Sequence, residues 1–147
     1  MENPDVLIRK IRPGAAWPGY ATAGAAGMDL AACLEEPLAV PPLGRVMVPT
    51  GLAIALPPGM TALVFARSGL ASRHGLALAN GVGVVDSDYR GEIICAMVNL
   101  GDQPYRIEPG DRIAQVVFVP VAHVRLIPAA DLPPSARGAG GFGSTGR

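Results

Sequence analysis

The sequence has 147 residues and is poor in cysteine, in aromatic residues and in net charge. Its two cysteines, Cys33 and Cys95, are too few for a disulfide framework, which excludes the small disulfide-stapled domains. Twelve basic side chains balance twelve acidic ones, which excludes binding by bulk attraction to nucleic acid or anionic lipid. A chain of this length can fold as one domain without a metal or a disulfide.

Long apolar runs are also missing. No run approaches the roughly 20 residues that a membrane span needs. Residues 1–5 lack the basic and apolar regions of a signal peptide. We therefore expect a cytoplasmic protein with reduced thiols that binds neither nucleic acid nor a membrane.

Glycine and proline are abundant, with 19 and 15 residues, so long helices are not expected. Between them recur short β-branched and apolar segments, a pattern typical of an all-β sandwich or barrel. The expected strands are residues 6–11, 46–48, 52–56, 61–65, 82–85, 93–98, 113–119 and 121–127. Turns are expected at residues 41–44, 57–59 and 108–111. Only residues 68–74 favour a helix, of two turns at most, with Ser68 as the N-cap candidate.

The composition changes at Pro133 and divides the chain into residues 1–132, a β-barrel domain, and residues 133–147, a glycine-rich tail. A tail so poor in apolar residues is typical of a solvated linker. It also carries Phe142, two hydroxyl side chains and Arg137, the groups that a flap needs to close over a phosphorylated ring. The tail alone leaves both interpretations open.

The densest polar cluster runs from Asp86 to Glu92, between two apolar segments, and predicts the tip of a hairpin. Aspartate, serine and glycine are ordinary turn formers, so the cluster can be purely structural. The hairpin also carries two carboxylates and Tyr89, and Asn80 precedes it. It therefore offers a base, an aromatic surface and an amide donor in one place.

A second polar segment, Arg67-Ser68-Gly69, follows an expected strand and opens the short helix. Its backbone N–H groups, hydroxyl and guanidinium can converge on a phosphate, which the helix dipole favours at that end. Alternatively, Ser68 caps the helix and Arg67 is solvated.

Two further segments are ambiguous when taken alone. In residues 110–115, Asp111 and Arg112 can pair, and Gln115 lies on a strand with an amide that can orient a water. Asp29 stands isolated after a glycine turn, which by itself indicates little.

Taken together, five ordered segments resemble the motifs of the trimeric deoxyuridine triphosphate diphosphatase (dUTPase) family. They are residues 26–30, 67–71, 84–93, 110–115 and 137–146, which span nearly the whole chain. The third keeps Asp-Ser-Asp-Tyr-Arg-Gly and the fifth keeps its full glycine-rich pattern. Ala66 stands where the family usually has proline and Met28 where it often has tyrosine, and neither change removes a chemical group.

The resemblance implies an all-β, jelly-roll-like distorted barrel, the dUTPase fold, with one short helix and a flexible C-terminal tail. It implies a homotrimer whose active sites are shared between subunits, with the tail closing over the site. The implied activity is hydrolysis of dUTP to dUMP and pyrophosphate, through Mg²⁺-assisted attack of water on the α-phosphorus. Such an enzyme limits uracil incorporation into DNA and supplies dUMP for dTMP synthesis.

The resemblance also implies a role for individual residues. The catalytic residues would be Asp86, which orients and activates the water, Gln115, which assists it, and Arg67. The phosphates would be held by Arg67, Ser68, Gly69, Arg137, Gly143, Ser144 and Thr145. Uracil would be read by Asn80, Val84, Val85 and Ile94 and covered by Phe142, while Tyr89 would leave no room for a 2′-hydroxyl. The cofactor Mg²⁺ would ride on the triphosphate, with Asp29 touching it only through water.

Two rival functions remain at this point. A related dCTP deaminase needs a glutamate for proton transfer, and alignment on Gly91 places that glutamate at Ala96, which disfavours deamination. A non-catalytic nucleotide-binding relative is the second, although Asp86 and the tail are both present. His74 and His123 lack partners at metal-ligand spacing and are expected to be structural.

Overall fold

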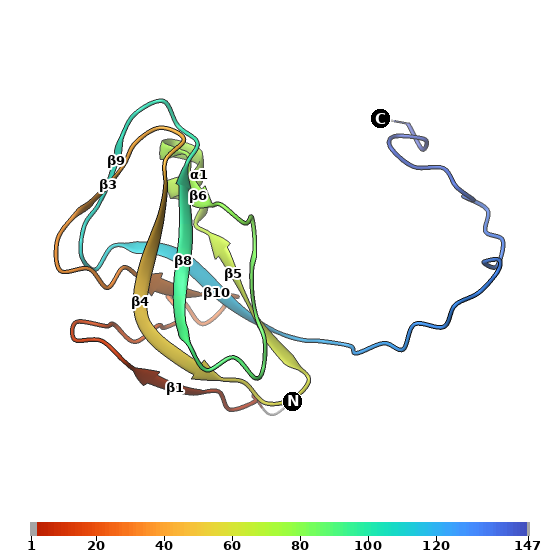
Figure 1. The fold of residues 1–147 in the computed structure, drawn as a ribbon, viewed down its shortest axis with the longest axis horizontal. Helices are drawn as coiled ribbons and strands as arrows, with labels where there is room; N and C mark the ends of the chain where they lie inside the picture. Colours follow the sequence, from red (N-terminus) through yellow and green to blue (C-terminus); the bar gives the residue numbers. More distant parts are fainter. Residues whose placement is uncertain (1–2, 147) are drawn as a thin grey trace.

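Short apolar segments form strands that account for nearly all of the regular structure in residues 3–146, which the computed structural model describes (Figure 1). The strands are β1 (Leu7–Lys10), β2 (Met28–Ala31), β3 (Leu38–Val40), β4 (Arg45–Ala55), β5 (Met60–Ala66), β6 (Leu76–Leu78), β7 (Gly83–Val85), β8 (Glu92–Asn99), β9 (Tyr105–Ile107) and β10 (Arg112–Pro120). One helix, α1 (Ser68–His74), lies between β5 and β6. The described chain contains no helix long and apolar enough to span a membrane.

The strands form two four-stranded sheets, ordered β1-β4-β8-β6 and β2-β10-β5-β7, and a two-stranded ribbon of β3 and β9. Every pair is antiparallel. Because neighbours in each sheet are distant in sequence, the chain passes repeatedly from one sheet to the other. The predicted all-β, jelly-roll-like architecture with one short helix is confirmed.

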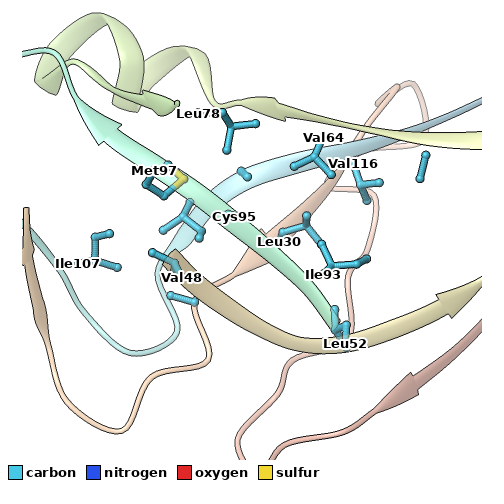
Figure 2. Packing of buried hydrophobic residues seen from close by; sticks show 14 of the residues in the cluster. Leu30, Val48, Leu52, Val64, Leu78, Ile93, Cys95, Met97, Ile107 and Val116 are labelled. Atoms are coloured by element: carbon cyan, nitrogen blue, oxygen red, sulfur yellow. The ribbon is translucent and has the colours of Figure 1, made fainter. Parts of the chain in front are cut away.

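The core lies between the two large sheets (Figure 2). Along β8, alternate residues point inward, as the two-residue period of a strand requires: Ile93, Cys95 and Met97 are buried. Leu30 on β2 and Val116 on β10 pack on them from the opposite sheet. Burial raises the pKa of the Cys95 thiol to about 12, so this cysteine is a small apolar residue of the core.

Residues 46–48 and 52–56, expected as two strands, belong to the single long strand β4. Its pairing with β8 shifts register between Pro49 and Ala53, where two extra residues form a bulge. Gly51 in this bulge has φ +70°, a conformation open to glycine. The buried Thr50 hydroxyl donates to the Ile93 carbonyl at 2.6 Å and so holds the bulge against β8.

The helix spans the expected residues, 68–74, but its N-cap differs from the prediction. Arg67 is the N-cap, with extended backbone, and its side chain makes no capping bond, so Ser68 as the N-cap is wrong. Ser68 is the first helical residue. Gly75 ends the helix at φ +70°, with its N–H donating to the carbonyls of Leu70 and Ala71.

The chain leaves the barrel after β10, earlier than the composition indicates. The Val121 N–H donates to the Gly59 carbonyl at 2.8 Å, and residues 121–140 are all exposed. The strand expected at 121–127 is wrong, because no neighbouring strand of the described chain pairs with it. Figure 1 shows this segment leading away from the sheets. The division of the chain at residue 133, with the tail starting there, stays a prediction.

Candidate functional site

A cavity of about 230 Å³ opens between β7 and β8. It is lined by six of the eight residues expected around uracil, the sugar and the water: Asn80, Val84, Val85, Asp86, Tyr89 and Ile94. The other two, Gln115 and Phe142, do not line it. Six further residues that the sequence did not indicate complete its wall: Val64, Leu78, Gly83, Ile93, Cys95 and Ala96. Ala96 shares a strand face with Ile94, so the two-residue period was the available signal for it.

The prediction of a hairpin around residues 86–92 is wrong, because the two flanking strands do not pair with each other. β7 pairs with β5 in one sheet, whereas β8 pairs with β4 and β6 in the other. No ladder joins β7 to β8 in residues 3–146. The gap between the two strands is therefore the cavity, and the backbone groups that face it are free to bind a ligand.

Ile94 turns its own backbone groups toward this gap. It lies opposite Pro49, which has no N–H, and the Pro49 carbonyl accepts from the Cys33 N–H at 2.8 Å on the other side. The two residues therefore form a pair without ladder bonds, in which the N–H and C=O of Ile94 point away from β4. On that side β6 has already ended, since its pairing with β8 stops at Leu78 and Met97.

The loop after β7 is held by its own main chain. The Tyr89 N–H donates to the Asp86 carbonyl at 3.1 Å, and the Arg90 guanidinium donates to the Ser87 carbonyl at 2.7 Å. The Tyr89 hydroxyl donates to the Glu92 carbonyl at 2.8 Å. Within residues 3–146 no donor reaches the exposed Asp86 carboxylate, which leaves it able to bind a water.

A second polar group gathers at the far end of the sheet β2-β10-β5. The Asp29 carboxylate lies 3.0 Å from Arg67 Nε and 3.2 Å from Arg112 Nη1, and Arg67 also donates to the Arg112 carbonyl at 3.1 Å. Gln115 lies directly opposite Asp29 on the neighbouring strand and donates to the Ala66 carbonyl at 3.1 Å. The structure thus brings together Asp29, Arg67 and Gln115, with Ser68 and Gly69 next in the chain.

The predicted pair of Asp111 with Arg112 is wrong. The Asp111 carboxylate accepts from the Glu108 backbone N–H at 2.8 Å and closes the turn before β10. Arg112 instead turns to Asp29, which lies 83 residues away along the chain. Asp111 lies in the turn that precedes β10, whereas Arg112 is the first residue of that strand.

One chain does not bring the two groups together. Val85 pairs with Ala62 on β5, whereas Gln115 pairs with Phe65. Asp86 therefore lies level with Thr61, four residues along the strand direction from the level of Gln115. Asp86 and Gln115 are also separated by two strand spacings across the sheet, so their backbones lie about 16 Å apart. The distance exceeds the reach of both side chains.

The tail residues lie apart from both groups. Arg137, Ser144 and Thr145 are exposed, as is Phe142, whose φ is +49°. The Arg137 guanidinium donates only to the nearby Gly140 carbonyl, at 2.8 Å, and the Ser144 N–H to that of Gly141 at 3.1 Å. Figure 1 shows this end of the chain far from the sheets.

The donor set does not form a protein cage for a metal ion. In residues 3–146 no three His, Cys, Asp or Glu side chains gather closely enough to hold one. Asp29 bonds one arginine through each oxygen and keeps lone pairs that can accept from water. These residues fit a Mg²⁺ ion that takes its ligands from phosphate oxygens and water, as this ion commonly does.

Comparison with known proteins gives the chain its family, because the family model for dUTPase matches residues 14–146. The chain belongs to the dUTPase family. A deoxyuridine 5′-triphosphate nucleotidohydrolase of Desulfitobacterium hafniense is 59% identical over 130 residues, 88% of this chain and 86% of the relative. A protein of the same name from Wolinella succinogenes is 49% identical over 147 residues, 100% of this chain and 97% of the relative.

Solved dUTPase structures share the fold. The Staphylococcus bacteriophage 80alpha dUTPase with dUpNHpp superposes with a TM-score of 0.88 at 26% identity, over 97% of this chain and 99% of that one. A phage phi11 dUTPase, described with a structural Mg(II) ion, superposes with a TM-score of 0.79 at 21% identity, over 88% and 99%.

Proposed function

We propose that this dUTPase hydrolyses dUTP to dUMP and pyrophosphate by attack of water on the α-phosphorus. The observation that carries the proposal is the cavity between β7 and β8, because it collects six of the eight residues expected around the base, the sugar and the water. The names of the relatives in Desulfitobacterium hafniense and Wolinella succinogenes support the same activity.

Uracil binds between β7 and β8 and is recognised mainly by backbone. The unpaired edges of the two strands offer N–H and C=O groups in a fixed arrangement, Ile94 among them, and the Asn80 amide adds a donor and an acceptor. Val84 and Val85 form the opposite wall, which leaves no space for the methyl group of thymine. Tyr89 lies against the deoxyribose and excludes a 2′-hydroxyl.

Asp86 binds the attacking water at the mouth of the cavity and accepts its proton. Because phosphoryl transfer asks a protein mainly for positioning and charge stabilisation, a carboxylate that fixes the water in line with the α-phosphorus is sufficient. Gln115 assists by orienting the same water through its amide. Arg67 stabilises the charge on the phosphates.

The phosphate-binding groups come from other subunits of a homotrimer. Asp86 and Gln115 lie too far apart within one chain to meet at one phosphorus, so a neighbour must supply Arg67, Ser68, Gly69 and Gln115. A tail then closes over the site, with Phe142 on the base and the phosphates held by Arg137, Gly143, Ser144 and Thr145. Ring closure by rotation about one axis gives three identical sites from such complementary parts.

Mg²⁺ would be held by the triphosphate and would supply neutralisation of its charge. On the protein side, Asp29 would face the ion only through water, and it holds Arg67 through the 3.0 Å ion pair. The alternative activity, deamination of dCTP, would need a glutamate at position 96. Ala96 instead places a methyl group in the cavity wall, which argues against deamination.

The activity is tested by measuring pyrophosphate release from dUTP, dTTP, dCTP and UTP, with Mg²⁺ and after chelation. We expect release from dUTP alone, lost on chelation, and no ammonia from dCTP. In ¹⁸O-labelled water the label should enter dUMP. Label in pyrophosphate would place the attack at the β-phosphorus, and comparable turnover of all four nucleotides would refute the proposed specificity.

A further inference from the structure

Arg12 and Glu92 form a two-pronged ion pair outside the cavity. Arg12 Nε and Nη2 donate to Glu92 Oε1 and Oε2 at 2.7 and 2.8 Å, across 80 residues of sequence. The Glu92 side chain is only 9% exposed and accepts a third bond from the Gly51 N–H at 2.8 Å. The pKa of Glu92 is held below its usual range, chiefly by the hydrogen bonds from Arg12, so this carboxylate is charged. Both of its oxygens accept hydrogen bonds.

The pair is anchored at the bulge of β4. A Cβ atom at Gly51 would lie 2.7 Å from the Ala15 Cβ and 3.2 Å from the Arg12 Cβ, so the N-terminal segment packs directly on the bulge. The Ile11 N–H donates to the Gly51 carbonyl at 2.8 Å. Glu92 is thereby fixed to two other segments at the first residue of β8.

The main chain of Glu92 holds a wall of the cavity. Its carbonyl accepts the Tyr89 hydroxyl at 2.8 Å, and Tyr89 lines the cavity beside Asp86. Gly91 allows this arrangement, because a Cβ atom there would overlap the Tyr89 ring and hydroxyl. Glu92 is not itself in the cavity wall, so it can act on a ligand only through Tyr89.

We propose that Arg12 and Glu92 are positioning residues that fix Tyr89 for discrimination against the 2′-hydroxyl. The inference rests on the proposed function, in which Tyr89 lies against the deoxyribose. The bonded carboxylate of Glu92 fixes the backbone of that residue. The Glu92 carbonyl in turn fixes the Tyr89 hydroxyl, so the Tyr89 ring keeps a constant distance from the sugar. Without the pair, the start of β8 loses its two bonds to Arg12, and the ring can move far enough from the sugar to admit a ribonucleotide.

The test compares kcat/KM for UTP with kcat/KM for dUTP in Arg12→Met and Glu92→Gln. We expect the ratio to rise about tenfold in both, since a displacement of roughly 1 Å at a reacting site commonly costs that much or more. Tyr89→Phe, which removes only the hydroxyl that Glu92 accepts, should raise the ratio similarly. Arg106→Met is the matched control, because it removes an ion pair of similar length, 2.6 Å, between Arg106 on β9 and Glu108 just after that strand.

Melting temperature and equilibrium binding of the non-hydrolysable analogues of dUTP and UTP are measured on the same proteins. A shift in the binding ratio supports positioning, because a loss of stability alone would leave the ratio unchanged. If Arg12→Met does not fold, Arg12→Lys and Glu92→Gln keep a charge or an acceptor and carry the same expectation. An unchanged ratio in the folded variants overturns the inference, while failure of the wild-type protein to hydrolyse dUTP would separately overturn the proposed function.

Discussion

At the scale of single residues, the proposed mechanism gives Asp86 the role of base. Asp86→Asn keeps the size of the side chain but cannot accept the proton of the attacking water. We expect turnover of dUTP to fall by about three orders of magnitude or more, while nucleotide binding and the melting temperature stay near wild type. Single-turnover kinetics and calorimetric titration with dUpNHpp check this. A variant that keeps more than about a tenth of wild-type turnover would remove Asp86 from the role of base.

Glu92 gives a prediction about pH. Its carboxylate pKa is lowered in the folded protein, chiefly by the hydrogen bonds from Arg12 and also by the Gly51 N–H. The stability it contributes is therefore present above its unfolded pKa, about 4.3, and is lost as the pH falls through the lower folded value. We expect the difference in melting temperature between wild type and Glu92→Gln to be constant near neutrality and to shrink below about pH 4. A difference that stays constant down to about pH 3 would contradict this account.

At the scale of elements, local patterns predict most strands but not their partners. The expected segments at 61–65, 93–98 and 113–119 correspond to β5, β8 and β10. The short strands β3 and β9 have three residues each, too few for a periodic signal. Residues 121–127 have strand composition but no neighbour in the described chain, and pairing, not propensity, makes a strand.

For the candidate site, too, local patterns indicate residues but not the long-range contacts between them. The residues of the polar loop were found because they are contiguous, and two of them, Asp86 and Tyr89, line the cavity. That β7 and β8 join different sheets could not be inferred, because turn chemistry reports a reversal and not which strand pairs beyond it. The pairs of Arg12 with Glu92 and of Arg112 with Asp29 span 80 and 83 residues, which no local pattern encodes.

The tail gives a prediction at the scale of elements, because the proposal has it close over the site. Deleting residues from Gly138 onward should abolish most turnover without lowering the melting temperature of the nucleotide-free protein, because residues 138–140 are exposed and bury no apolar surface. Differential scanning calorimetry and the pyrophosphate assay measure the two effects on one preparation. A large loss of melting temperature would show that the tail is a structural strap.

At the scale of the whole molecule, the two sheets divide the catalytic groups. The β7–β8 gap holds Asp86 and most of the residues proposed to read the base, while Asp29 on β2, Gln115 on β10 and Arg67 just after β5 form the second group. Register places the two sets about 16 Å apart within one chain. We therefore propose that a working site needs at least two copies, and this is the central claim of our account.

The most direct measurement is complementation between inactive variants. An Asp86→Asn chain and an Arg67→Met chain are denatured together in equal amounts and refolded, with native mass spectrometry to confirm mixed oligomers. Each variant alone should be nearly inactive. If neighbouring chains supply Asp86 and Arg67, about a quarter of the sites in the mixture are whole, because each residue is intact with a probability of about one half. Recovery of about a quarter of wild-type turnover is the predicted result, and mixed oligomers with no recovered activity would contradict the shared site.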